Sequence, residues 1–253
     1  MKNLIYCILI IIAVSCKKDD TEIAANPDTV LDEYPEWYTL KAPVDYQVMG
    51  VWGNYDKTIL ISTMSKLFRT TDHGRHWTQV HEQNSGMFSV IQYQDTLFTM
   101  SGLANQTKKD VYQQVLVHAD NFSVDDGKTW RRYVARNPVL SDIPQFEAVD
   151  KRFLTNPIIS NSGITYKINQ VFLDGPKATT GTFETPGVIT SKGALLNLPQ
   201  LHQLQSLYLD DQQRLYIAAT DAVCSRGHSG GVFSFCNSTN GRGVVYVSKK
   251  PML

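Results

Sequence analysis

The chain has 253 residues, of which 42% are hydrophobic and 19% are charged. It carries 24 Lys and Arg residues and 24 Asp and Glu residues, so its formal net charge at pH 7 is zero. Proteins that bind nucleic acid generally carry a basic excess that pairs with phosphates, so this balance argues against a nucleic-acid partner. The length is enough for one large domain or two small ones.

Residues 1–15 have the pattern of a secretory signal peptide. Lys2 provides a positive charge, and residues 4–14 are apolar throughout. This run is about half the length that a bilayer-spanning helix needs, so it indicates a signal segment rather than a transmembrane anchor.

Cys16 lies where cleavage of that signal is expected. The residues before it, Ala13-Val14-Ser15, complete a sequence that resembles the lipobox of bacterial lipoproteins. The resemblance implies that the Cys16 thiol receives a diacylglycerol and that its amine is then acylated, for example with palmitate. Several acyl chains on one residue anchor a protein stably where a single chain is marginal. We therefore predict that this lipid attaches the protein to a membrane. The alternative is an ordinary secretory peptide with a chance cysteine.

Residues 16–33 are predicted to form a lipidated tether. Lys17-Lys18-Asp19-Asp20 resembles the export signal of Bacteroidetes surface lipoproteins, in which a lysine and two acids follow the lipidated cysteine. This resemblance implies an outer-membrane protein at the cell surface, whereas the residues alone also fit a solvated linker. The remaining tether is polar and contains Pro27, which is typical of a flexible segment.

Residues 34–253 are predicted to form one all-β domain, because short β-rich runs broken by Gly, Asn and Asp recur and helical periodicity is nearly absent. Four pairs of apolar runs flank tight polar turns at spacings of roughly forty to sixty residues, the range expected for propeller blades. We predict a small or irregular β-propeller with four to five antiparallel blades. The paired runs are residues 48–52 and 58–63, 88–93 and 96–100, 158–159 and 164–168, and 207–209 and 214–218.

Two segments that follow the first two strand pairs fit the pattern Ser/Thr-x-Asp-x-Gly-x-x-Trp. They contain Thr70, Asp72, Gly74 and Trp77 in the first segment, and Ser123, Asp125, Gly127 and Trp130 in the second. This pattern resembles the Asp-box, or BNR repeat, of sialidase-like β-propellers. Residues 191–196 and 239–244 are degenerate versions, with Leu196 and Val244 in the place of the tryptophan.

The resemblance implies that both boxes are structural and lie away from the ligand-binding face. The physical reason is local: the carboxylate and hydroxyl bond to turn backbone groups, Gly adopts a conformation costly for other residues, and Trp covers the turn. Asp126 occupies a variable position of the second box, so we expect its replacement to leave stability nearly unchanged.

Cys224 and Cys236 remain after the leader and the lipidation site are set aside, and an exported chain can keep such a pair as a disulfide. We predict that bond. A metal site needs more ligands than His228 nearby supplies, so we predict no metal and no cofactor.

The sialidases of this family pose an enzyme alternative. They use three arginines that grip a carboxylate, a Tyr/Glu nucleophile pair and an acid/base Asp. This chain has no Arg-Ile-Pro element, and only Glu82, Glu147 and Glu184 follow the first box. Other catalytic motifs are also absent from the sequence, so we predict no catalytic residue.

The predicted function is a surface-anchored lipoprotein whose propeller is a non-catalytic binding or assembly module for an unknown glycan or protein ligand. The alternative is a sialidase-type glycoside hydrolase. Trp37, Tyr38, Trp52 and Tyr55 are candidates for stacking on a ligand, although each also fits packing between blades.

Overall fold

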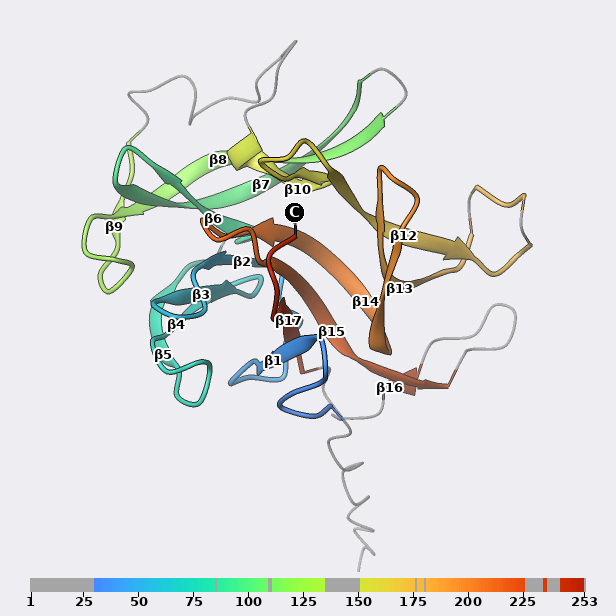
Figure 1. Cartoon of the computed structure of the whole chain (residues 1–253). Helices are drawn as coiled ribbons and strands as arrows, with labels where there is room; N and C mark the ends of the chain where they lie inside the picture. Colours follow the sequence, from blue (N-terminus) through green and yellow to red (C-terminus); the bar gives the residue numbers. More distant parts are fainter. Residues whose placement is uncertain are drawn as a thin grey trace, which may run out of the picture.

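The computed structural model describes residues 30–84, 86–108, 111–134, 151–175, 177–179, 181–225, 234–235 and 242–252 (Figure 1). The predicted lipidation site Cys16, the segment 17–20, Cys236 and the side chain of Cys224 lie outside the described residues, so the lipid and the disulfide stay predictions. The described elements are strands and one short 3₁₀ helix, and all strand pairs are antiparallel. The prediction of an all-β antiparallel fold is confirmed, and the number of blades stays a prediction. Among the described residues, no helix has the length and apolarity needed to cross a membrane.

A four-stranded sheet contains the first predicted hairpin and the first box. Its strands pair in the order β2 (Gly50–Gly53), β3 (Ile59–Ser62), β4 (Lys66–Thr70) and β5 (Thr78–Glu82). The first box, residues 70–77, makes the turn from β4 to β5.

A five-stranded sheet contains the second predicted hairpin and the second box. The order is β10-β8-β7-β6, with β9 paired to β8, so the second box makes the turn from β8 to β9. The 3₁₀ helix η1 (Lys151–Phe153) leads directly into β10. The strands are β6 (Ser89–Tyr93), β7 (Thr96–Lys108), β8 (Val111–Ser123), β9 (Arg131–Arg132) and β10 (Leu154–Asn156).

An eight-stranded sheet contains the remaining strands in the order β1-β17-β15-β14-β13-β12-β11, with β16 paired to β15. The first and last described strands are partners, with Trp37 opposite Ser248 and Lys41 opposite Val244. The strands are β1 (Trp37–Lys41), β11 (Ile158–Ile159), β12 (Thr165–Phe172), β13 (Phe183–Thr190), β14 (Leu195–Leu209), β15 (Leu215–Ser225), β16 (Ser234–Phe235) and β17 (Val244–Ser248).

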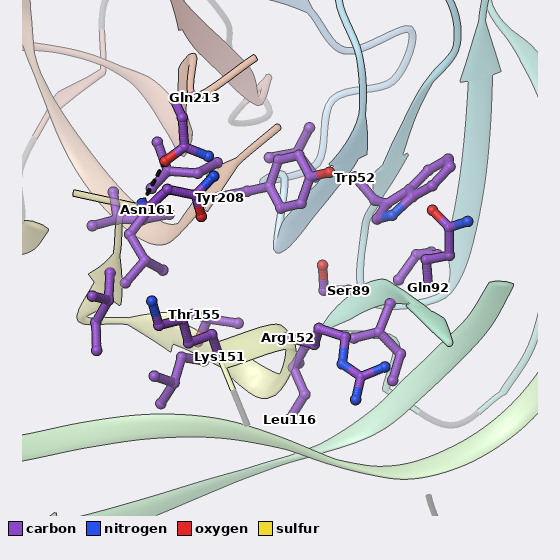
Figure 2. A pocket seen from close by; sticks show the side chains of 18 of the residues that line it. Trp52, Ser89, Gln92, Leu116, Lys151, Arg152, Thr155, Asn161, Tyr208 and Gln213 are labelled. Atoms are coloured by element: carbon purple, nitrogen blue, oxygen red, sulfur yellow. Dashed lines mark hydrogen bonds between the residues drawn. The ribbon is translucent and has the colours of Figure 1, made fainter. Parts of the chain in front are cut away.

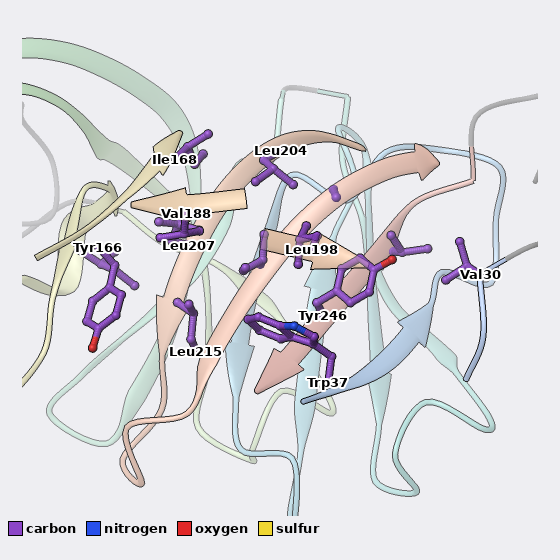
Figure 3. Close-up of a cluster of buried hydrophobic side chains, with 14 of the residues drawn as sticks. Val30, Trp37, Tyr166, Ile168, Val188, Leu198, Leu204, Leu207, Leu215 and Tyr246 are labelled. Carbon is purple, nitrogen blue, oxygen red and sulfur yellow. The ribbon is translucent and has the colours of Figure 1, made fainter. Parts of the chain in front are cut away.

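Several strands are buried on both faces because the sheets pack against one another. On β17, Val244 and Tyr246 belong to a cluster on one face of the eight-stranded sheet, where Tyr246 meets the Trp37 ring edge-on (Figure 3). Val245 and Val247 point to the opposite face and pack against the four-stranded sheet. Alternate residues of a strand point to opposite faces of the sheet, so a continuous apolar run indicates that both faces are packed against other parts of the protein.

Residues 30–33 also pack on the domain. The Val30 side chain is 1% exposed, and the Asp32 carbonyl accepts a 3.0 Å hydrogen bond from the Thr39 amide.

Candidate functional site

A cavity of about 470 Å³ lies where the three sheets meet (Figure 2). We call it the central cavity; its walls come from β2, β6, β10, β11 and β14, with η1 and Leu116 of β8 closing one side. Its volume lies within the usual range for ligand pockets. It is the candidate functional site because several sheets contribute to it at once.

Aromatic side chains form one side of the central cavity. Trp52 of β2 and Tyr208 of β14 lie across from η1 (Figure 2). The Tyr208 ring packs edge-to-face on Tyr216, with 5.5 Å between the centroids. Burial raises the pKa of the Tyr208 hydroxyl well above its usual range, so this group stays neutral at physiological pH.

Two cations form the other side. The Lys151 Nζ donates to the Ser160 carbonyl oxygen at 3.5 Å, and the Arg152 guanidinium lies over the Tyr93 ring, 4.8 Å from its centroid. Asp95, in the turn between β6 and β7, is the one acidic residue among the described lining residues. The cavity therefore presents an excess of positive charge on the η1 side.

Amide side chains complete the lining, which includes Gln92, Gln94, Asn161 and Gln213. The Gln213 Oε1 accepts a hydrogen bond from the Asn161 backbone amide at 2.7 Å. This bond joins two turns of the eight-stranded sheet and fixes the position of the Gln213 side chain. An amide carries both a donor and an acceptor, so these side chains suit a neutral polar ligand.

The turn that carries Gln213 is held by Asp210. The Asp210 Oδ1 accepts from the backbone amides of Gln212 and Arg214, at 2.9 and 2.8 Å. Its Oδ2 accepts from the Tyr216 hydroxyl at 2.9 Å, and Tyr216 is fully buried. This network lies in the fourth predicted hairpin, residues 207–209 and 214–218, and it places Gln213 at the cavity.

The described residues that line the central cavity do not include the three arginines and the Tyr/Glu pair that sialidases use. Of these residues, one is an arginine, Arg152, and none is a glutamate. No group of three His, Cys, Asp or Glu residues gathers closely enough to hold a metal ion in the described parts of the chain.

The two boxes lie outside the lining of the central cavity and share one hydrogen-bond pattern. In the second, the Asp125 Oδ1 accepts from the Ser123 hydroxyl at 2.7 Å and from the Thr129 amide at 2.9 Å. The Ser123 Oγ in turn accepts from the Gly127 amide at 3.0 Å. The first box repeats each of these bonds with Thr70, Asp72, Gly74 and His76.

These bonds stabilise the charged form of both box carboxylates. The backbone amides of His76 and Thr129 contribute most, and they hold the pKa values of Asp72 and Asp125 well below the usual range. The carboxylates are therefore poor proton donors at neutral pH, which fits a turn-building role.

Each box also packs on the neighbouring sheet. The Trp77 Nε1 donates to the Lys41 carbonyl oxygen of β1 at 3.1 Å. Gly127 has a φ of 74°, and a Cβ placed there would lie 2.8 Å from the Leu60 Cδ1 of β3. A side chain at this position would be strained by the left-handed backbone and would have to displace the end of the Leu60 side chain.

The side chain of Asp126, whose replacement we expect to leave stability nearly unchanged, has partners on the neighbouring sheet, and these contacts argue against that expectation. The Asp126 Oδ2 accepts from the Thr58 hydroxyl at 2.5 Å and pairs with the Arg69 guanidinium at 2.7 Å. The left-handed backbone at Asp126, with a φ of 61°, turns the carboxylate back toward the four-stranded sheet. The Asp126 contacts are made with residues of the four-stranded sheet and not with the box turn. The motif describes only the turn, so it leaves this position variable.

We predict that Arg69 and Asp126 are energetically coupled. In a cycle of Arg69→Ala, Asp126→Ala and the double variant, urea denaturation should give a coupling energy of about 0.5–1 kcal/mol, since the pair is partly exposed. The combination of Asp126→Ala with Arg75→Ala is the matched control and should be additive. A coupling of zero for Arg69 and Asp126 would show that the pair contributes nothing.

The remaining predicted aromatic residues have different environments. Trp37 is 6% exposed and belongs to the core, and Trp52 lines the cavity. Tyr38 and Tyr55 stack face to face at 4.5 Å, and the His73 ring of the first box covers Tyr55 at 4.5 Å. Of the four candidates, Trp52 alone lines the central cavity.

No protein-family model and no curated protein matches the chain. The solved structures that match include a chain described as "YCF48 bound to D1 peptide". The two share 11% sequence identity, and the match covers 88% of this chain and 99% of that chain, with a TM-score of 0.35. A likeness at this level carries no argument about the ligand of the present protein.

Proposed function

We propose that this protein is a lipid-anchored, non-catalytic β-propeller that binds its ligand in the central cavity. The propeller assignment rests on hairpin-built antiparallel sheets, with the turns of two sheets formed by Asp-box segments, and on the strands of all three sheets that surround one cavity. A glycan or a protein segment is the proposed ligand class, and no nucleic acid is expected at zero net charge.

The observation that carries the proposal is the composition of the central cavity. Amides, two aromatic rings and two cations converge on a volume suited to a ligand. The described lining contains no pair of carboxyl groups of the kind that glycoside hydrolysis generally requires. The cavity therefore fits recognition better than hydrolysis.

The test compares a variant that fills the cavity with one that does not. Gln92 is exposed on β6 and lines the cavity, whereas Gln79 is exposed on β5, outside the lining. The parent, Gln92→Trp and Gln79→Trp proteins are applied to a glycan array and to a library of random nonapeptides. We expect probes that the parent and Gln79→Trp retain and that Gln92→Trp loses. Retention of every probe by Gln92→Trp, or turnover of a fluorogenic sialoside by the parent, would contradict the proposal.

The proposed anchor depends on Cys16. Cys16→Ala should remove the acyl chains and release the protein from the membrane fraction, because no lipid then remains at the N-terminus. Labelling cells with a fatty-acid analogue measures this directly, and Cys7→Ala in the signal segment is the control that should keep the label. Equal labelling of Cys16→Ala and the parent would exclude lipidation at this residue.

The proposed surface location depends on Lys18, Asp19 and Asp20. Replacing all three with alanine should make the protein resistant to protease added to intact cells, while fatty-acid labelling stays at the parental level. If the variant remains as sensitive as the parent, these residues are a tether and not an export signal.

A further inference from the structure

Three residues that line the central cavity have a strained backbone. In the described part of the chain, six residues other than glycine have a left-handed backbone, and three of the six line this cavity. They are Gln94, Asp95 and Gln213, with φ angles of 47°, 61° and 62°. A left-handed backbone is costly for a residue that carries a Cβ, and strain of this kind concentrates at functional sites. The strain marks these turns as candidates for ligand contact.

The turn of Gln94 and Asp95 gives the clearest case. Tyr93 pairs with Thr96, so these two residues form the whole loop between β6 and β7. A two-residue loop that is left-handed at both positions generally contains Asn-Gly or Asp-Gly, because glycine adopts this conformation without strain. The Gln94 Nε2 donates to the Tyr93 hydroxyl at 3.4 Å, and the Asp95 side chain has no hydrogen bond or ion pair with the described residues. Local stability therefore does not explain the choice of these two residues.

The accessible lining of the cavity consists largely of amides and one carboxylate. Gln92, Asp95 and Asn161 are exposed, and their side chains make no hydrogen bond or ion pair with the described residues. Gln92 and Asn161 lie on different sides of the cavity (Figure 2). The apolar lining is buried, as Leu116 and Leu207 show with 2% exposure each. A ligand therefore meets polar groups that accept hydrogen bonds and, at the amides, also donate them.

The two cations of η1 already have partners. The Lys151 Nζ donates to the Ser160 carbonyl oxygen, and the Arg152 guanidinium lies over the Tyr93 ring. An anionic ligand would have to compete with these contacts, whereas the side chains of Gln92 and Asn161 need no such exchange. The lining therefore favours a neutral ligand.

The strand edges add nothing to the accessible surface. Ser89, Val90 and Ile91 of β6 are buried. Gly50 of β2 packs directly on Phe88 and Ser89. An extended peptide finds no open backbone edge here, so recognition depends on side chains.

We propose that the turn of Gln94 and Asp95 contacts the ligand of the central cavity, and that this ligand is a neutral glycan with vicinal hydroxyl groups. Each hydroxyl carries a donor and an acceptor, so two adjacent hydroxyls match the paired polar atoms of one amide or one carboxylate. The partly buried Trp52 ring gives an apolar wall for the C–H surface of a sugar. The proposal rests on the proposed function, because it names the ligand class of the same cavity.

The first test replaces the turn with an unstrained one. The full-length protein in detergent carries Gln94→Asn together with Asp95→Gly, the pair that such loops favour. The melting temperature should rise by roughly 2–4 °C, because strain is removed. Binding to a neutral glycan that the parent retains on the array should weaken roughly tenfold or more. A melting temperature below that of the parent would overturn the strain, and undiminished binding would overturn the ligand contact.

The matched control changes another strained residue. His118 of β8 has a φ of 58°, is exposed and lies outside the described lining. His118→Gly should bind the glycan as the parent does. An equal loss of binding in His118→Gly would show a general effect of backbone changes and would overturn the role of the turn.

The second test changes the ligand. Arrayed neutral glycans are treated with mild periodate, which cleaves the C–C bond between adjacent hydroxyls, and the resulting aldehydes are reduced with borohydride. Glycans that the parent binds should lose roughly tenfold or more in affinity. Unchanged binding would overturn recognition through vicinal hydroxyls.

The third test addresses the charge of the ligand. Binding of an untreated neutral glycan should change less than about twofold between about 0.05 M and 0.5 M NaCl, because salt screens interactions between charges. Tight binding of acidic glycans alone, weakened by salt, would overturn the preference for a neutral ligand.

The remaining outcomes separate this proposal from the proposed function. Peptides that the parent binds and Gln92→Trp loses, without any bound glycan, would overturn the glycan class and keep the cavity as the binding site. Neutral glycans that bind Gln92→Trp as strongly as the parent would overturn the cavity, and with it the proposed function. Failure of the parent to bind any neutral glycan would overturn the glycan proposal.

Discussion

Trp130→Ala is expected to lower the free energy of unfolding by about 3 kcal/mol, at the low end of the range for truncating a large aromatic side chain in a core. Trp130 is partly buried against the cluster of Leu60, Leu67 and Val90 between the four- and five-stranded sheets. Its Nε1 also donates to the Gly127 carbonyl oxygen at 3.1 Å. The variant therefore loses contact between two sheets and a bond within the turn.

Denaturation in urea measures this change, with Trp130→Phe as the control. Phenylalanine keeps most of the apolar contact and loses the indole donor, so it should cost only about 1 kcal/mol. Asp125→Ala should also have a lower free energy of unfolding than the parent, since it leaves the Ser123 hydroxyl and the Thr129 backbone amide without their acceptor. A loss of less than about 0.5 kcal/mol for Trp130→Ala would place the ring outside the stabilising core.

His202 is expected to make the protein less stable as the pH falls from 6.5 toward 4. Its side chain is 1% exposed, and the Nδ1 lies 2.7 Å from the Thr220 carbonyl oxygen, so this nitrogen carries the hydrogen. The Nε2 then accepts from the Tyr246 hydroxyl at 2.8 Å. Burial lowers the pKa of His202 from 6.5 to about 4, because a charged imidazole is poorly solvated there.

The direction of the change in stability with pH follows from the pKa values of His202 in the unfolded and folded states. The unfolded chain takes up the proton near pH 6.5, and the folded protein does so only near pH 4. The stabilisation is complete above pH 6.5, declines as the pH falls and is lost below about pH 4. The total loss of stabilisation is about 3 kcal/mol. Unfolding measured between pH 7 and pH 4 should show this loss in the parent and in His118→Gln, whose side chain is exposed. The loss should be reduced by about 3 kcal/mol in His202→Gln, in which the contribution of His81 remains, because burial also lowers the pKa of His81. An equal pH dependence in His202→Gln and the parent would contradict this account.

The local structure of this protein could be predicted from sequence because its signals are local. Apolar runs on both sides of a short polar turn form the predicted hairpins, as between β2 and β3 and between β6 and β7. The box residues lie within eight positions of one another, so the hydrogen bonds that build the turn need no distant partner. These features depend on the conformation of the turns, which the residues within each short segment determine.

The central cavity could not be predicted in the same way. Its lining combines residues from Val51 to Gln213, and η1 contributes Lys151 and Arg152 without any motif around them. The pairing of β1 with β17 and the contact of Arg69 with Asp126 join segments far apart in the chain. The partners of His202 lie on β15 and β17, which is why its burial has no signature near position 202.

Amide hydrogen exchange of the full-length protein, with and without a probe that the parent retains, tests binding at the central cavity most directly. We predict added protection in β6 and in β2, β10 or β11, and none in the box turns 70–77 and 123–130. Protection confined to the box turns, or to the outer strands β5 and β9, would contradict the central cavity as the binding site.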